Sequence, residues 1–182
     1  DAASQDDLDT MLEQMAELVL DAGAMDVLVA DTPAKIKDAW AARSSFLEAI
    51  MHETKLLDEC DVVVPVNKIA DYLDFVNKTG EECGLVIKSF GHAGDGNLHI
   101  YQCSNDLEEE EFKSRVDKFF EIIYKEAASC GGLVSGEHAI GSGKIKYLVD
   151  SVGETNMALM EGIKRVFDPK MILNPGKVCY SL

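Results

Sequence analysis

SFGHAGDGNLH, residues 89–99, is the stretch that decides the fold, because it joins two segments with strand patterns. The preceding run LVIKSF, residues 85–90, is apolar with β-type residues, and the following run LHIYQC, residues 98–103, alternates between apolar and polar. Glycines within the connection permit positive φ angles and close backbone approach. The pattern predicts two strands joined as a hairpin by a polar, glycine-rich loop.

Two histidines stand at the ends of this loop. His92 leaves the first predicted strand and His99 lies near the start of the second, so the two imidazoles can converge on one point. Imidazole nitrogen is the commonest ligand for borderline divalent ions, and an open site needs a third ligand, usually a carboxylate, from elsewhere. The spacing alone is a weak signal. It leaves two alternatives open: a metal site, or a hairpin whose histidines are only solvated or hydrogen-bonded.

Composition and charge exclude several classes of protein. The chain has 182 residues, with 17 basic and 33 acidic side chains and a net charge of -16, which argues against a nucleic-acid surface and favours solubility. The five cysteines are odd in number and form no CxxC pair, so the simplest compartment is a reducing cytoplasm. No apolar run reaches membrane-spanning length. Because the chain begins directly in a helix signal, we expect it to be part of a longer polypeptide.

Helical and strand-like periodicities alternate along the chain. We expect helices over residues 4–23, 32–50, 67–80, 106–129, 146–151 and 155–167, and strands over residues 25–29, 60–65, 85–90, 98–103 and 133–135. This order predicts an α+β fold with a largely antiparallel sheet and helices packed on one face, a ferredoxin-like cap domain, followed by a C-terminal helical segment. We place the cap domain at residues 1–134 and the C-terminal segment at residues 135–182.

A second polar, glycine-rich segment, SGEHAIGSGK, spans residues 135–144. Glu137 and His138 are adjacent, and neighbours in extended backbone point opposite ways, so one can bind a metal while the other faces a substrate. The segment is not a nucleotide P-loop, because Lys144 is followed by Ile145 rather than Ser or Thr. Residues 89–99 likewise fail as a dinucleotide-binding motif, because a histidine occupies the third glycine position.

The helix predicted from residue 32 carries a further candidate. Arg43 lies three residues after Trp40, on the same side of the helix, so its guanidinium emerges beside an aromatic ring. It can grip a carboxylate through two hydrogen bonds, or be a surface charge over a buried tryptophan. Both alternatives stay open on the sequence pattern.

Three motifs stand in a fixed order: GHAGDGNLH (residues 91–99), SGEHAIGSGKIKYL (residues 135–148) and FDPKMILNPGKV (residues 167–178). Together they resemble the C-terminal domain of the FAD-linked oxidases, the family of D-lactate dehydrogenase, glycolate oxidase large subunit and D-2-hydroxyglutarate dehydrogenase. ARSSFLEA (residues 42–49) and DECDVVVP (residues 58–65) are similar to preceding family segments. In this family an N-terminal domain binds FAD, and the present chain resembles the substrate-binding cap and the terminal segment that faces the flavin.

The resemblance implies a set of ligands and a base. His92 and His99 match the two histidine ligands of a divalent metal (Zn, Mn or Fe), and Glu137 matches the carboxylate ligand. His138 matches the proposed general base. Arg43 resembles the arginine that anchors the substrate carboxylate.

The resemblance also implies supporting residues and one departure. Lys144 and Asn97 lie inside the motifs and are expected to support the site from its edge, and Asn174 lies in the tail that approaches the cofactor. The family usually has SGEHGIG, and here Ala139 replaces the glycine after the histidine. If that position needs a positive φ angle, the local turn must differ.

The implied reaction is FAD-dependent oxidation of a small 2-hydroxy acid of the D-lactate or glycolate type. The metal polarises the substrate, His138 takes the hydroxyl proton, and hydride passes to the flavin of the N-terminal domain. Two alternatives are a stand-alone metal hydrolase with a His, His, Glu site and a non-catalytic module that docks an electron-transfer protein. If the flavin domain is a separate part, an exposed apolar patch is expected near residues 174–178.

Overall fold

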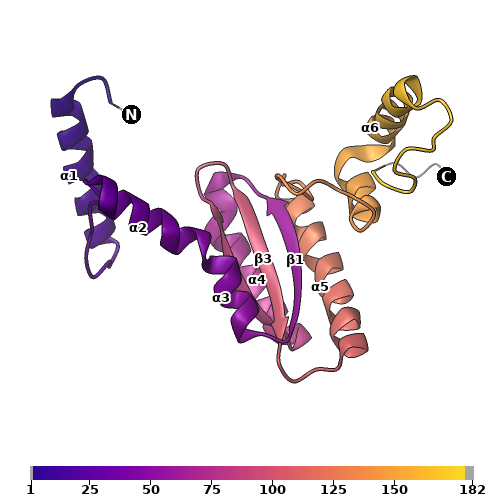
Figure 1. Ribbon diagram of the computed structural model, residues 1–182, viewed down its shortest axis with the longest axis horizontal. Coiled ribbons are helices and arrows are strands. Elements are labelled where there is room, and N and C mark those ends of the chain that lie inside the picture. The colour runs from indigo at the N-terminus through magenta and orange to yellow at the C-terminus, as the bar shows by residue number, and fades with distance from the viewer. Residues whose placement is uncertain (1, 179–182) are drawn as a thin grey trace. The chain divides into compact units, whose positions relative to one another are not determined.

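The computed structural model describes residues 2–178, which form ten helical and strand elements (Figure 1). In chain order these are α1 (Gln5–Asp21), α2 (Pro33–Ser44), α3 (Phe46–Glu53), β1 (Leu56–Val63), the 3-10 turn η1 (Val66–Lys68), α4 (Ile69–Cys83), β2 (Val86–His92), β3 (Asn97–Ser104), α5 (Glu109–Ser129) and α6 (Ile145–Phe167). The three strands form one antiparallel sheet in the order β1-β3-β2. The predicted α+β class is therefore confirmed.

The predicted hairpin forms the centre of this sheet. β3 pairs with β2 on one side and with β1 on the other, so His99 lies opposite both Phe90 and Asp61. The loop depends on Gly96, whose φ angle is 81° and whose carbonyl accepts a 3.0 Å hydrogen bond from the Val64 backbone N–H. A Cβ atom there would overlap the Val64 carbonyl oxygen. Only glycine fits this turn without strain.

The order β1-α4-β2-β3-α5 is that of the first five elements of a ferredoxin-like fold. The position of its last strand is marked by a single antiparallel bridge between Val63 and Leu133, with N–H···O distances of 3.0 and 2.8 Å. The strand expected over residues 133–135 is thus reduced to one bridge, because bends and a glycine-rich loop follow at once. The bridge brings the segment of residues 135–144 to the end of β1.

The two faces of the sheet differ in character. α4 and α5 pack against one face and bury the main apolar core with side chains such as Cys60, Val62 and Ile100 (Figure 1). The opposite face carries a smaller apolar cluster, in which Ile50 of α3 packs with Tyr101 and Cys103 of β3. Alternation along β1 and β3 places Glu59, Asp61 and His99 on this same face. The fold therefore provides one buried face for stability and one polar face for a site.

Several helix signals are confirmed. The Ser4 hydroxyl accepts a 3.2 Å hydrogen bond from the Asp7 backbone N–H, and Thr32 caps α2 in the same way. The two helical pieces expected at the C-terminus form α6, where Gly153 interrupts the helical backbone with φ 78° and ψ 161°.

Other expectations are wrong. Residues 25–29 form no strand, because no neighbouring strand pairs with them among the described residues. The helix from residue 32 ends at Ser44 and α3 follows as a separate helix. The helix expected over residues 67–80 begins at Ile69, after η1, and extends to Cys83.

Contacts divide the chain into two units, Asp1–Glu48 and Ala49–Leu182. In the first unit, α1 and α2 contain no buried residue. The boundary expected from the sequence is a different one, between residues 134 and 135, where a cap domain would meet a flavin-facing segment. That boundary stays a prediction. Among the described residues, every helix is too short or too polar to cross a membrane.

Candidate metal centre

Three predicted ligands converge on the polar face of the sheet. His92 ends β2, His99 is the third residue of β3, and Glu137 comes from the loop that follows the bridge to β1. Glu137 Oε1 lies 3.0 Å from His99 Nε2 and 3.7 Å from His92 Nε2. One ligand atom from each side chain falls within 4.8 Å of the others.

This donor set fits a divalent ion. Bonds of about 2.0–2.1 Å in a tetrahedral site place neighbouring ligand atoms about 3.3 Å apart, close to both separations. The His99 side chain is 6% exposed, whereas the Glu137 side chain is 50% exposed. The cluster is therefore anchored in the sheet and open on its outer side, as a site with three protein ligands and one exchangeable position requires.

His138 lies against the same cluster. Its ring stacks on that of His99 with centroids 4.8 Å apart and an interplanar angle of 27°, and its Nε2 lies 3.9 Å from Glu137 Oε1. The expectation that Glu137 and His138 point opposite ways is wrong. The backbone bends at residues 136–138 instead of running extended, so both side chains reach His99. Their assignment as ligand and base stays a prediction.

The loop is held in place by Asp61, which sequence reasoning missed. Its fully buried carboxylate accepts a 2.6 Å hydrogen bond from the Ser135 hydroxyl and bonds of 2.8–3.1 Å from the backbone N–H groups of residues 136–138. Burial by itself would raise the pKa of the Asp61 carboxyl, but the Ser135 hydroxyl and these N–H groups outweigh it and hold the pKa below its usual range. A carboxylate inside an otherwise apolar strand was the available signal.

Glu59 is the second residue that was missed. It lies two positions before Asp61 on β1, on the same face of the sheet, and directly opposite Tyr101 of β3. Its Oε1 atom is 3.4 Å from His99 Nδ1 and 3.2 Å from His138 Nδ1. Burial and the neighbouring Glu59 carboxylate raise the pKa of Tyr101. Glu59 precedes the strand predicted over residues 60–65, so the sequence pattern gave no signal for it.

Lys144 and Asn97, the two residues expected to support the site, contact Asp61 and Gly136, and their supporting role stays a prediction. Lys144 Nζ lies 3.3 Å from the Asp61 backbone carbonyl oxygen and 3.9 Å from its carboxylate. Asn97 is buried against Gly136, where a Cβ atom would come within 2.5 Å of the amide oxygen. The contacts tie both residues to the loop, and a role of Lys144 toward the cofactor stays a prediction.

The C-terminal tail returns to the same loop. The Val178 backbone N–H donates a 2.8 Å hydrogen bond to the Gly141 carbonyl. Asn174 is exposed, with a φ angle of 46°, and its amide oxygen accepts a 3.3 Å bond from Lys177. The part assigned to Asn174 near a cofactor stays a prediction. The expected apolar surface is present beside this tail, at Ile172 and Leu173, which are both more than half exposed.

Ala139, which departs from the family motif, keeps a glycine-like conformation. Its φ angle is 62°, in the left-handed region. The turn therefore needs a positive φ angle at this position, and alanine adopts it at a cost in strain. The Ser135 hydroxyl oxygen, whose proton goes to Asp61, lies 3.3 Å from the Ala139 carbonyl oxygen.

Arg43 belongs to the other unit. Its guanidinium carbon lies 5.7 Å from the centroid of the Trp40 ring, so the expected pairing of cation and aromatic is confirmed. Trp40 is exposed rather than buried. The position of Arg43 relative to the histidine cluster is not determined, and its role toward a substrate carboxylate stays a prediction.

A cavity of about 470 Å³ opens beside the cluster. It is lined by Glu59, Asp61, His138 and Lys144, together with Tyr147 of α6. Its volume suits a small organic ligand.

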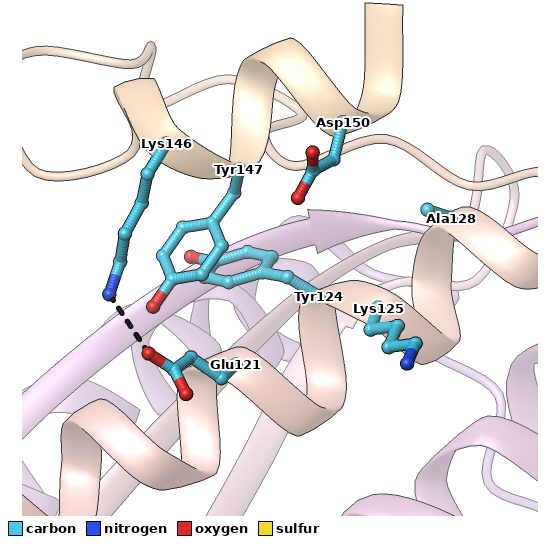
Figure 2. A pocket seen from close by; sticks show the side chains of 7 residues that line it. All are labelled: Glu121, Tyr124, Lys125, Ala128, Lys146, Tyr147 and Asp150. Atoms are coloured by element: carbon cyan, nitrogen blue, oxygen red, sulfur yellow. Dashed lines mark hydrogen bonds and ion pairs between the residues drawn. The ribbon is translucent and has the colours of Figure 1, made fainter.

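A second cavity, of about 580 Å³, lies between α5 and α6 (Figure 2). There Tyr124 and Tyr147 face each other with ring centroids 4.4 Å apart, and Lys146 lies 3.5 Å from Glu121. None of its lining residues belongs to the predicted site.

Comparison with known proteins identifies the family. The family model described as FAD linked oxidases, C-terminal domain, matches residues 1–178. A D-lactate dehydrogenase of Anaerostipes hadrus is 59% identical over all 182 residues, and a D-lactate dehydrogenase of Archaeoglobus fulgidus is 37% identical over 93% of the chain. Glycolate oxidase subunit GlcD of Bacillus subtilis is 33% identical over 92% of the chain. The chain spans 38%, 37% and 35% of the lengths of these three relatives, respectively. The chain thus belongs to the family of FAD-linked oxidase C-terminal domains.

Proposed function

We propose that this chain is the substrate-binding and metal-binding part of an FAD-dependent dehydrogenase or oxidase of small 2-hydroxy acids. The observation that carries the proposal is the convergence of His92, His99 and Glu137 on one point, with His138 stacked on the buried histidine. The relatives named D-lactate dehydrogenase and glycolate oxidase support D-lactate or glycolate as the substrate class.

Each side chain has a defined task in this proposal. His92, His99 and Glu137 hold a divalent ion, with Zn, Mn and Fe as candidates. When bound, such an ion supplies Lewis acidity that lowers the pKa of a coordinated hydroxyl. His138 accepts the hydroxyl proton of the substrate at Nε2, the ring nitrogen on the side of Glu137. Arg43 forms an ion pair with the substrate carboxylate.

The redox partner is proposed to lie in another domain. FAD, held by that domain, supplies the acceptor for the hydride that leaves the alcohol carbon. Two observations support such a neighbour: α1 and α2 bury none of their residues, and large apolar side chains are exposed along the end of α6 and the tail. The exposed set comprises Leu159, Ile163, Val166, Phe167, Ile172 and Leu173. An electron-transfer protein as final acceptor and a cytoplasmic location belong to the same proposal.

The first experiment measures metal content. Protein purified without chelator is analysed for Zn, Mn and Fe beside the His99→Ala variant, with His52→Ala as the matched control because His52 is exposed on α3 and outside the cluster. We expect about one ion per chain in the wild type and in His52→Ala, and loss of the ion in His99→Ala. Equal metal in all three folded proteins would reject the site.

The second experiment tests the reaction. In a polypeptide that joins this chain to its flavin domain, anaerobic mixing with D-lactate or glycolate should bleach the flavin absorbance. The isolated chain should bind no FAD tightly and should oxidise neither acid. Metal-dependent hydrolysis by the isolated chain, without flavin, would favour a hydrolase instead.

A further inference from the structure

Glu59 occupies a position that the proposed ligands and base leave unexplained. The rings of His99 and His138 are stacked, and a single oxygen of Glu59, Oε1, approaches Nδ1 of both. The separations of 3.4 and 3.2 Å are close to the N–H···O hydrogen-bonding range of about 2.7–3.2 Å. One side chain therefore faces the same ring atom of two different histidines.

The two atoms of the contact between Glu59 and His99 are buried, so water cannot replace either partner. Glu59 Oε1 and His99 Nδ1 are both shielded from solvent, and at these separations neither atom meets the geometry of a hydrogen bond to any described residue. A buried polar atom without a partner is costly, so a small movement of either side chain that shortens the 3.4 Å separation is expected to let the two atoms satisfy each other. A carboxylate oxygen has two lone pairs and can accept from both Nδ1–H groups.

The consequence concerns the tautomers of the two rings. A neutral imidazole carries one proton, so a hydrogen bond from Nδ1–H to Glu59 leaves Nε2 with a free lone pair. For His99, Nε2 is the atom 3.0 Å from Glu137 Oε1, where the proposed ion is held. For His138, Nε2 is the atom that would accept the substrate proton. The Glu59 carboxylate thus leaves Nε2 of His99 free to bind the ion and Nε2 of His138 free to accept the proton.

We propose that Glu59 is a shared positioning residue, which fixes both His99 and His138 in the Nδ1–H tautomer and couples the metal ligand to the base. The inference rests on the proposed function for the roles of the two Nε2 atoms. The hydrogen-bonding arrangement itself does not depend on any bound ion or flavin.

The test combines two readouts on the 182-residue chain. Long-range ¹H–¹⁵N spectra of histidine-labelled protein report which ring nitrogen carries the proton, and titration calorimetry with Zn²⁺ reports the affinity of the site. The variants are Glu59→Ala, which removes the acceptor, and Glu59→Gln, which keeps an accepting oxygen without the charge. Asp58→Asn is the matched control, because it removes a neighbouring charge while the asparagine oxygen can still accept the 2.8 Å hydrogen bond that the Glu59 backbone N–H donates to Asp58.

We expect the metal-free wild type and Asp58→Asn to show Nδ1–H for His99 and His138, and Glu59→Ala to lose this signature. We expect Zn²⁺ affinity to fall about 10-fold to 100-fold in Glu59→Ala, the usual effect of removing a group that orients a metal-bound histidine, and less in Glu59→Gln. Circular dichroism and thermal melting verify that each variant is folded.

Two results would overturn the inference. One is an unchanged pair of tautomers in folded Glu59→Ala. The other is an equal loss of affinity in Asp58→Asn, which would make the effect one of net charge. If the wild type binds no Zn²⁺ yet Glu59→Ala still changes the tautomers, the proposed metal function fails while the positioning role of Glu59 stands.

Discussion

Replacing Asp61 with asparagine should detach the loop that carries Glu137 and His138. The carboxylate is fully buried and accepts from the Ser135 hydroxyl and from three consecutive backbone N–H groups. Asparagine keeps one accepting oxygen and puts an NH₂ donor in place of the other. All four donors reach Oδ2, and only the Gly136 N–H also reaches Oδ1. Asparagine therefore weakens all four bonds by removing the charge of their acceptor, a difference of about 1 kcal/mol per bond, so we expect a loss of roughly 3–5 kcal/mol.

Urea unfolding measures this change in the free energy of unfolding. The control is Asp71→Asn, an exposed carboxylate 3.8 Å from Lys68, for which we expect a change below about 1 kcal/mol. Zn²⁺ affinity should fall at least 10-fold in Asp61→Asn, because Glu137 loses its fixed position. A loss below about 1 kcal/mol with unchanged Zn²⁺ affinity would refute the reasoning that this buried acceptor organises the site.

The pH dependence of stability gives an independent check on Asp61. Its pKa is held below the usual range in the folded chain, so its contribution is complete above the unfolded value of about 3.9. That contribution is lost as the pH falls from there through the folded pKa. The difference in stability between wild type and Asp61→Asn should therefore shrink below about pH 4. A difference that stays constant from pH 6 to pH 2 would contradict the assignment.

Three further predictions concern the same loop. At Ala139, where the φ angle is 62°, glycine should change stability by less than about 1 kcal/mol, whereas valine should destabilise by about 1–2 kcal/mol; equal melting temperatures would contradict this. Gly136→Ala places a Cβ atom 2.5 Å from the Asn97 amide and should destabilise by about 1–3 kcal/mol in urea unfolding, and a neutral result would show that Asn97 moves freely. With the flavin domain present, Glu137→Gln should weaken metal retention, while His138→Ala should retain the metal and slow flavin reduction by about 100-fold to 10,000-fold in anaerobic stopped flow. If His138→Ala loses the metal as completely, His138 is a ligand or a support.

Features that depend on a short stretch of chain could be read from the sequence. Helix starts at Ser4 and Thr32 follow from a side-chain oxygen that reaches a backbone N–H three residues away. The hairpin over residues 89–99 follows from glycines between two strand patterns. The break in α6 at Gly153 matches the two separate helical patterns.

The tertiary structure decided what depends on partners distant in sequence. Residues 25–29 have a strand pattern but find no strand to pair with, whereas β1 starts at Leu56, four residues before its predicted start, because it pairs with β3 as far as Ser104. Strand formation requires hydrogen bonds to another segment, and local composition cannot supply them.

The residues of the site likewise fall into those that the sequence indicated and those that only the fold revealed. The resemblance in sequence singled out His92, His99, Glu137 and His138, and the fold brought all four together. Asp61 and Glu59 were missed. Asp61 holds the loop of residues 135–144, and Glu59 approaches the rings of His99 and His138. Their importance arises from burial and from partners 74–77 residues away in the case of Asp61. Desolvation gives a buried carboxylate its strength as an acceptor, and only the folded chain determines which carboxylates are desolvated.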